Sequence, residues 1–183
     1  MNLTKEAIIT TALTILDSYG LQDVSMRRIA STLGVQPSAL YWHFLSKQDL
    51  LAGIADAILA DLPPYSGSDL TRLPLWAARL HALLLSHRDA AELVWSVLAI
   101  RDWESGIGYP VEQGLRQSGL TPDMARAGAQ GILHLVLGHG FDEDQRRQAV
   151  RLKVIPESPH DSVTTLDDAV AIFVAGLEAS RTC

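Results

Sequence analysis

Six histidines are the residues of this chain whose chemistry includes metal binding and proton transfer. They are His43, His81, His87, His134, His139 and His160. No two of them have the His-x-x-x-His spacing that places two imidazoles on one face of a helix, and the sequence lacks an HExxH motif. Cys183 is the only cysteine. The sequence therefore predicts no structural zinc site, no other metal and no cofactor.

An acidic cluster beside one histidine is the remaining candidate for a metal site. His139 is followed by Asp142, Glu143 and Asp144, whose carboxylates suit a hard cation. A solvated, charged loop after a helix end explains the same residues and is the commoner arrangement. Gly-x-Ser-x-Gly, phosphate-binding and dinucleotide-binding motifs do not occur. We therefore expect no catalytic residues. The alternative is a small α-helical enzyme that uses histidine and carboxylate groups.

The stretch 34–44, GVQPSALYWHF, holds a proline, three aromatic residues and a histidine, but no Lys, Arg, Asp or Glu. Leu40 and Phe44 lie four residues apart, so on a helix they share one face and are expected in the core. On one short helix Pro37, Ser38, Tyr41 and Trp42 cannot all share that face. The exposed face therefore begins with small residues and carries a hydroxyl one turn later, a profile that suits a helix entering a major groove about 12 Å wide.

Helical periodicity places this stretch in a small three-helix unit. Gly20 and the Gly34-Val35 turn are the expected stops between its helices, and Pro37 suits a first helical position. Two short helices joined by a glycine turn and braced by a longer one form a helix-turn-helix pattern. The expected helices run from Thr4 to Tyr19, from Ser25 to about Leu33, and for about seven residues from Pro37.

The rest of the chain shows helical periodicity without a convincing strand or internal repeat, which predicts an all-α fold. The predicted domains are a helix-turn-helix DNA-binding domain over 1–47 and a helical effector-binding and dimerisation domain over 48–183. A helix over Ser46–Leu62, opened by a capping box, connects them. Further helices are expected at about 70–86, 89–101, 105–118, 122–140 and 166–181, with a charged loop over about 141–164.

Composition and charge limit the possible partners. Net charge is −6, yet residues 1–47 carry four basic and three acidic side chains, whereas the remainder carries 11 and 18. Only the N-terminal quarter therefore suits contact with phosphates. Hydrophobic residues make up 48% of the chain, enough for a sizeable core. No uncharged apolar stretch is long enough for a membrane span, and the N-terminus lacks signal-peptide features, so we expect a cytoplasmic protein.

Residues about 4–51, with SMRRIASTLGVQPSALYWHFLSKQDLL at their centre, resemble the DNA-binding domain of the tetracycline-repressor (TetR) family. The run LYWHF followed by SK and LL is the specific part. The remainder resembles the tetracycline-repressor branch in LLSHRD at 84–89, in the LHLVLG–DEDQ region at 133–145 and in AGLE at 175–178. The resemblance implies a homodimeric transcriptional repressor, not an enzyme, that binds a palindromic operator and is released by a small molecule.

The resemblance also implies which residues contact DNA. Arg27 and the start of the third helix would read base edges, since a guanidinium suits guanine. Hydroxyl, imidazole and ammonium groups would hold phosphates without specifying sequence. His43 equally suits a structural cap, and an adaptor that binds protein in place of DNA is a further alternative. The expected set is Ser25, Arg27, Arg28, Gln36, Pro37, Ser38, Tyr41, His43 and Lys47.

The expected effector site departs from the resembling branch, which binds a drug–magnesium chelate through a histidine after the HRD motif. That position is Val94 here, and neighbouring polar positions fall on Pro63, Trp76 and Leu98. An apolar lining binds aromatic or alicyclic ligands well and ions poorly. We expect a neutral, hydrophobic effector that needs no magnesium, unless the tryptophans fill the core and leave no cavity. The expected lining is Trp76, Leu80, Val94, Trp95, Leu98, Trp103, His134 and Asp142.

The helices near 122–140 and 166–181 are the expected dimer contacts. The first holds small residues that permit close helix packing, and the second is apolar on more than one side. A lone protomer would leave those faces in water. The small residues are Ala125, Ala127, Gly128, Ala129 and Gly131.

Overall fold

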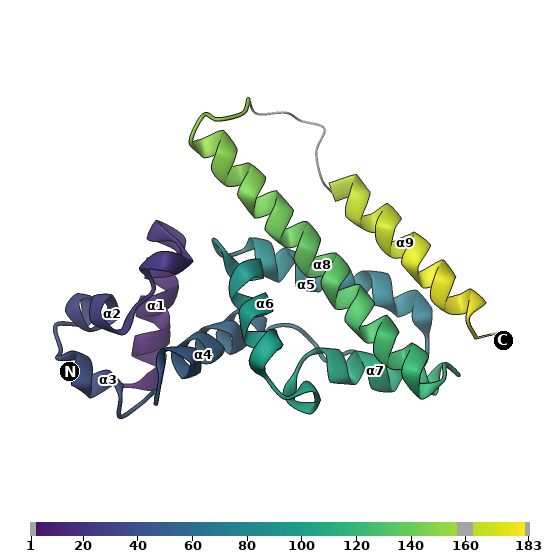
Figure 1. The fold of residues 1–183 in the computed structure, drawn as a ribbon, viewed down its shortest axis with the longest axis horizontal. Helices are drawn as coiled ribbons and strands as arrows, with labels where there is room; N and C mark the ends of the chain where they lie inside the picture. Colours follow the sequence, from purple (N-terminus) through teal and green to yellow (C-terminus); the bar gives the residue numbers. More distant parts are fainter. Residues whose placement is uncertain (1–2, 157–162, 182–183) are drawn as a thin grey trace.

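The protein is described by a computed structural model, which covers residues 3–156 and 163–181. Helices are the only regular elements within these ranges, which confirms the predicted all-α fold (Figure 1). A small N-terminal unit of α1 to α3 lies at one end and is joined through α4 to a larger helical body. No helix of the described part is both long and apolar enough to cross a membrane.

The N-terminal unit consists of α1 (Lys5–Tyr19), the 3-10 turn η1 (Leu21–Asp23), α2 (Met26–Leu33) and α3 (Pro37–Leu40). The Thr4 hydroxyl accepts a hydrogen bond from Ala7 N at 3.2 Å, and Ser25 Oγ accepts one from Arg28 N at 3.2 Å. These contacts satisfy free donors at the starts of α1 and α2, so both predicted caps are confirmed. Helix α3 is shorter than predicted because its last turn opens after Leu40, while Phe44 still returns to the core.

Helix α4 (Lys47–Leu59) links the two units. Ser46 Oγ accepts from Asp49 N at 3.0 Å, and Asp49 Oδ2 accepts from Leu45 N at 2.8 Å, so the predicted capping box is present. The helix ends three residues before the predicted Leu62. It packs against α1 at one side and against α5 and α6 at the other.

The larger body contains α5 (Leu73–Leu85), α6 (Ala90–Ile100), α7 (Gly108–Gln117), α8 (Pro122–Arg151) and α9 (Val163–Ala179), with 3-10 turns η2 (Leu70–Arg72) and η3 (Trp103–Ser105). Helices α8 and α9 run antiparallel along one side (Figure 1). Pro74 lies inside the predicted helix, in the first turn of α5, where its missing N–H removes no helical hydrogen bond.

The predicted loop over 141–164 is wrong in its first part, because α8 continues to Arg151. Residues 141–151 contain neither glycine nor proline, so nothing in them stops a helix. An i,i+4 pair also supports this part of α8: Arg147 Nη2 donates to Glu143 Oε1 at 2.7 Å. The acidic cluster after His139 is therefore helical and does not form a flexible loop.

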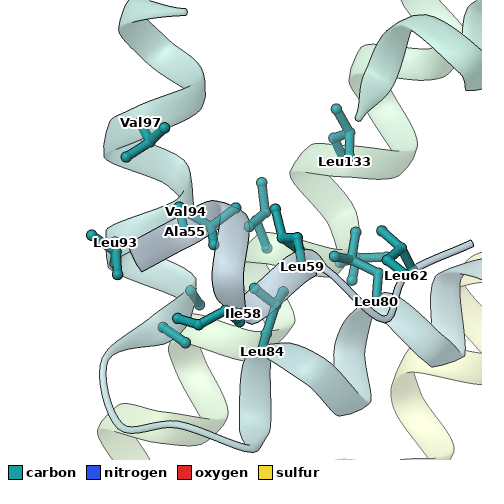
Figure 2. Packing of buried hydrophobic residues seen from close by; sticks show 14 of the residues in the cluster. Ala55, Ile58, Leu59, Leu62, Leu80, Leu84, Leu93, Val94, Val97 and Leu133 are labelled. Atoms are coloured by element: carbon teal, nitrogen blue, oxygen red, sulfur yellow. The ribbon is translucent and has the colours of Figure 1, made fainter. Parts of the chain in front are cut away.

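The core of the larger body lies where α4, α5, α6 and α8 meet (Figure 2). Aliphatic side chains from all four helices interlock there. In close packing of this kind, loss of a single methylene group lowers stability. The core therefore fixes the position of α4 against the larger body. The residues labelled in Figure 2 are Ala55, Ile58, Leu59, Leu62, Leu80, Leu84, Leu93, Val94, Val97 and Leu133.

The small residues of α8 serve packing within the chain more than predicted. Ala125, Gly128 and Ala129 are buried. A Cβ at Gly128 would lie 2.8 Å from Leu115 of α7 and 3.0 Å from Leu177 of α9, so this glycine lets both helices approach. Of the predicted dimer-contact run, only Ala127 is fully exposed, and Gly131 packs against Phe173.

Candidate nucleic-acid interface and effector pocket

The start of α3 presents a small, polar surface to solvent. Gln36, Pro37 and Ser38 are all exposed, while Leu40 is completely buried and anchors the helix from below. Tyr41, half exposed, follows one turn later. Lys47 is exposed at the start of α4. The predicted contact residues of this region therefore lie at the surface of the N-terminal unit, whereas His43 is only partly accessible.

The two arginines of α2 have different environments. Arg27 is exposed and makes no hydrogen bond or ion pair with another described residue. Arg28 forms an ion pair with Asp23, and its guanidinium lies 3.8 Å from the centre of the Tyr19 ring. A shallow surface hollow of about 420 Å³ contains both arginines together with Ser25. Arg27 is thus available to a ligand, while Arg28 is already held by neighbours.

Two residues of this surface were missing from the predicted set. Trp42 is 90% exposed and Leu45 is 88% exposed, both in the segment between α3 and α4. Large apolar side chains this exposed indicate a binding surface. The sequence signal was present, since Trp42 cannot share the buried face of Leu40 and Phe44.

A pocket of about 230 Å³, which we call the tryptophan pocket, lies between the C-terminal part of α6, η3 and α8. Four of the eight predicted effector residues line it: Trp95, Leu98, Trp103 and His134. The Trp95 and His134 rings are stacked, with centroids 5.1 Å apart and an angle of 26° between their planes. Ala99, Gln130, Leu133 and Leu137 complete the lining, so the pocket is largely apolar with an amide and an imidazole as polar groups.

Trp103 is fixed in the wall of this pocket by a buried carboxylate. Its Nε1 donates to Glu112 Oε2 at 2.6 Å, and the Arg126 guanidinium lies 3.8 Å from its ring centre. Arg116 and Arg126 both form ion pairs with Glu112, at 2.7 and 3.3 Å. Burial raises the pKa of Glu112, but the bonds from Trp103, Arg116 and Arg126 outweigh burial, so the pKa is lowered overall.

The other four predicted effector residues do not join this pocket. Trp76 is buried, and its Nε1 donates to the carbonyl of Pro63 at 3.1 Å. Leu80 and Val94 are completely buried in the core of Figure 2. Asp142 is exposed on α8 and lies outside the tryptophan pocket. Trp76, Leu80 and Val94 therefore fill the interior position at which we expected the ligand.

The acidic stretch of α8 is engaged by protein groups. Glu143 pairs with Arg147 and lies 3.4 Å from His81 Nε2. Asp144 Oδ2 accepts from Gln148 Nε2 at 2.9 Å and from the backbone N–H of Asp89 at 3.2 Å. Burial raises the pKa of Asp144, and the nearby Asp89 carboxylate raises it further. Within residues 3–156 and 163–181, no cluster of three His, Cys, Asp or Glu side chains has metal-binding geometry.

Polar contacts join the N-terminal unit to the larger body through the loop before α6. His87 Nδ1 lies 3.0 Å from the Asp17 carboxylate of α1. Asp89 Oδ2 accepts from Leu21 N at 2.7 Å, while its Oδ1 accepts from Gln148 Nε2 of α8 at 2.6 Å. Asp89 therefore bridges the N-terminal unit and α8, the longest helix of the body.

A second polar link joins α6 to α4. The Arg101 guanidinium, which follows α6, donates two hydrogen bonds to the Asp56 carboxylate at 2.7 and 3.0 Å. Arg101 lies between the tryptophan-pocket residues Ala99 and Trp103 in the chain. The Arg101–Asp56 pair therefore connects the end of α6, next to the tryptophan pocket in the chain, to α4.

The sequence profile described as "Bacterial regulatory proteins, tetR family" matches residues 8–54. Tetracycline repressor protein class C from Escherichia coli is 36% identical over 143 residues, which are 76% of this chain and 56% of that repressor. Tetracycline repressor protein class E from Escherichia coli is 31% identical over 168 residues, 86% of this chain and 76% of that repressor. The chain belongs to the TetR family.

Solved structures agree with TetR-family membership over the whole chain. BioQ of Mycobacterium smegmatis superposes with a TM-score of 0.88 at 31% identity, covering 98% of this chain and 99% of BioQ. BioQ with its double-stranded DNA operator gives a TM-score of 0.76 at 31% identity, with coverages of 97% and 99%. A TetR variant from Acinetobacter baumannii AYE in complex with minocycline gives 0.80 at 26% identity, with coverages of 98% and 99%.

Proposed function

We propose that this protein is a homodimeric transcriptional repressor that binds a palindromic operator and leaves it when a hydrophobic effector occupies the tryptophan pocket. The observation that carries the proposal is the exposed, slim start of α3 near Arg27, whose side chain has no partner among the described residues. The structural neighbour BioQ, solved with its double-stranded DNA operator, supports it. Residues 1–47 are the reading domain, and residues 48–183 form the effector and dimerisation domain. The role places the protein in the cytoplasm with the operator DNA.

The exposed face of α9 is the contact that we propose between the two protomers. Helix α9 carries an outward face of small and apolar residues whose centre, Ile172, is 75% exposed. Ala175, Gly176 and Ala179 lie on the same face and are also exposed. Small residues around one large aliphatic side chain suit close helix packing against an identical face. A dimer joined there presents two copies of α3 to successive turns of a palindromic duplex.

The effector acts through the link between the pocket and α4. A ligand in the tryptophan pocket presses on the end of α6, where Arg101 holds Asp56 of α4. Because α4 carries the reading unit, a small shift of α4 changes the separation of the two α3 helices. The ligand releases DNA only to the extent that it binds this altered arrangement more tightly than the operator-bound one.

Arg27→Ala and Lys47→Ala should weaken operator binding in different ways. Loss of the Arg27 guanidinium removes a base contact, so affinity should fall by roughly 1–3 kcal/mol and selectivity should relax at one operator position. Loss of the Lys47 charge removes a phosphate contact, so binding to every sequence should weaken and the salt dependence should become flatter. Fluorescence anisotropy on operator and single-substituted duplexes, at several salt concentrations, measures both effects.

Arg79→Ala provides the control for charge alone, because Arg79 is an exposed arginine of α5 in the larger body. It should leave operator affinity and its salt dependence unchanged. Identical behaviour of the Arg27 and Lys47 variants on every duplex would show that their roles are not those of a base reader and a phosphate contact.

Effector release should not need a divalent metal. The tryptophan pocket offers rings, aliphatic groups, one amide and one imidazole, and its described lining contains no carboxylate. Titration with neutral aromatic compounds should quench tryptophan fluorescence and release a labelled operator equally well with and without EDTA. Release that occurs only when magnesium is present would contradict a metal-free, hydrophobic effector.

A further inference from the structure

A larger groove adjoins the tryptophan pocket on the same side of the molecule. It has a volume of about 390 Å³, lies between the N-terminal part of α6 and the middle of α8, and shares Trp95 and Leu137 with the pocket. Gly138 is one of its lining residues, and a Cβ placed on that glycine would meet no atom of another helix within 4 Å. Trp95 and Phe141, exposed by 45% and 44%, form aromatic walls. We call this space the Gly138 groove.

One carboxylate stands at the edge of these apolar walls. Glu92, in the first turn of α6, is the only charged residue among the described residues that line the Gly138 groove. It is partly buried, yet it makes no hydrogen bond or ion pair with another described residue. The buried carboxylates Glu112 and Glu143 and the partly buried carboxylate Asp144 all have protein partners. The first turn of a helix favours an acidic residue because of the helix dipole. This interaction does not occupy the Glu92 carboxylate oxygens, which can therefore accept a hydrogen bond from a ligand.

We propose that the Gly138 groove binds an organic cation with a flat aromatic body. The ring system lies between Trp95 and Phe141 above Gly138, and the ammonium group forms a charge-assisted hydrogen bond with Glu92. The Trp95 ring also favours a cation near its face. Charge complementarity supports this occupant, because no basic residue lines the groove and the whole chain has a net charge of −6.

This binding site goes beyond the proposed function, which concerns a neutral effector in the neighbouring pocket. It is tested on protein without DNA, so failure of operator binding and failure of this site are separate results. The competing occupant is a second copy of the chain seated on the groove. That outcome is distinguishable because it would tie the groove residues to oligomeric state.

The first experiment compares two ligands of the same shape and different charge. 1-Naphthylmethylamine is a cation at neutral pH, and 1-naphthalenemethanol is its neutral counterpart. Titrations followed by tryptophan fluorescence should give roughly tenfold tighter binding of the amine to the wild-type protein. Glu92→Gln keeps the side-chain shape and removes the charge, so the preference for the amine should fall to about threefold or less, the part that the Trp95 ring supplies. A preference for the amine that stays at about tenfold in Glu92→Gln would overturn the proposal.

The second experiment fills the groove. Gly138→Leu places a side chain in the open space above α8 and should weaken binding of the amine by more than about tenfold. Gly138→Ala makes the same backbone change with only a methyl group and should stay within about threefold of the wild type. Leu75→Ala, in a separate hollow beside Trp76, is the control for binding elsewhere.

Three results would contradict the site. Unchanged affinity of the amine in Gly138→Leu would place the amine elsewhere, and weakened affinity of the amine in Leu75→Ala would place it at the other hollow. A change in oligomeric state of Gly138→Leu, measured by light scattering on the same samples, would identify the groove as a contact between copies. Circular dichroism checks that each variant is folded. Glu92→Gln tests the site without filling the groove.

Discussion

Ile172→Glu is expected to convert the protein to a monomer and to lower its operator affinity by more than about a hundredfold. Ile172 is 75% exposed in the protomer, at the centre of the outward face of α9. In the proposed dimer two copies of this residue meet, so the substitution buries two like charges against each other without partners. A monomer reads a single half-site and loses the gain of holding two at once.

Ile100→Glu is the matched control, because Ile100 is similarly exposed, by 69%, but ends α6 on another side of the body. It should remain dimeric and retain operator binding. Light scattering at micromolar concentration gives the oligomeric state, and anisotropy gives the affinity. If Ile172→Glu stays dimeric, or if Ile100→Glu dissociates as well, the face of α9 is not the contact between protomers.

Gly20→Ala is expected to destabilise the protein by about 3 kcal/mol, the second large effect, by breaking the joint between the two units. Gly20 has φ 93° and ψ 173°, a conformation that is essentially restricted to glycine. A Cβ there would lie 2.6 Å from Asp89 Oδ2 and 3.1 Å from the Arg88 guanidinium. The substitution therefore strains the backbone and displaces the aspartate that accepts from Leu21 N.

Gly34→Ala separates these two causes. Gly34 also has a positive φ, 69°, but its ψ of 29° is the left-handed helical conformation, and an added Cβ meets nothing within 4 Å. Its cost should be about 1–2 kcal/mol of backbone strain alone. Urea denaturation of both variants measures the free energy of unfolding. Equal losses would show that the contact between Gly20 and the loop before α6 contributes nothing to stability.

Local signals in the sequence predicted well where the first helices start and which side chains of α3 are buried. The caps at Thr4, Ser25 and Ser46 depend on side-chain contacts three residues away, which are readable without a fold. The helical spacing that buries Leu40 and exposes Tyr41 is also readable from the sequence alone. The end of α8 was harder, since charge alone does not distinguish a solvated loop from an exposed helix face.

The tryptophan pocket, which we propose as the effector site, contains only part of the predicted set, because a pocket depends on contacts between distant segments. Trp76 and Trp103 look alike in the sequence, yet the Trp76 indole bonds to the Pro63 carbonyl in the core and the Trp103 indole bonds to Glu112 at the pocket wall. Arg28 likewise looks as available as Arg27 until the fold brings Asp23 and Tyr19 against it. Partners of this kind follow from tertiary structure.

The most direct test of the central claim is the mass of the complex that the protein forms with duplex DNA from upstream of its own gene. A paired repressor should bind as two protomers on each palindromic site, with α3 of each in one half-site. Affinity should fall steeply as salt rises, and a scrambled duplex should bind much more weakly. Binding that is equally weak on both duplexes, or a complex of one protomer per site, would contradict the account.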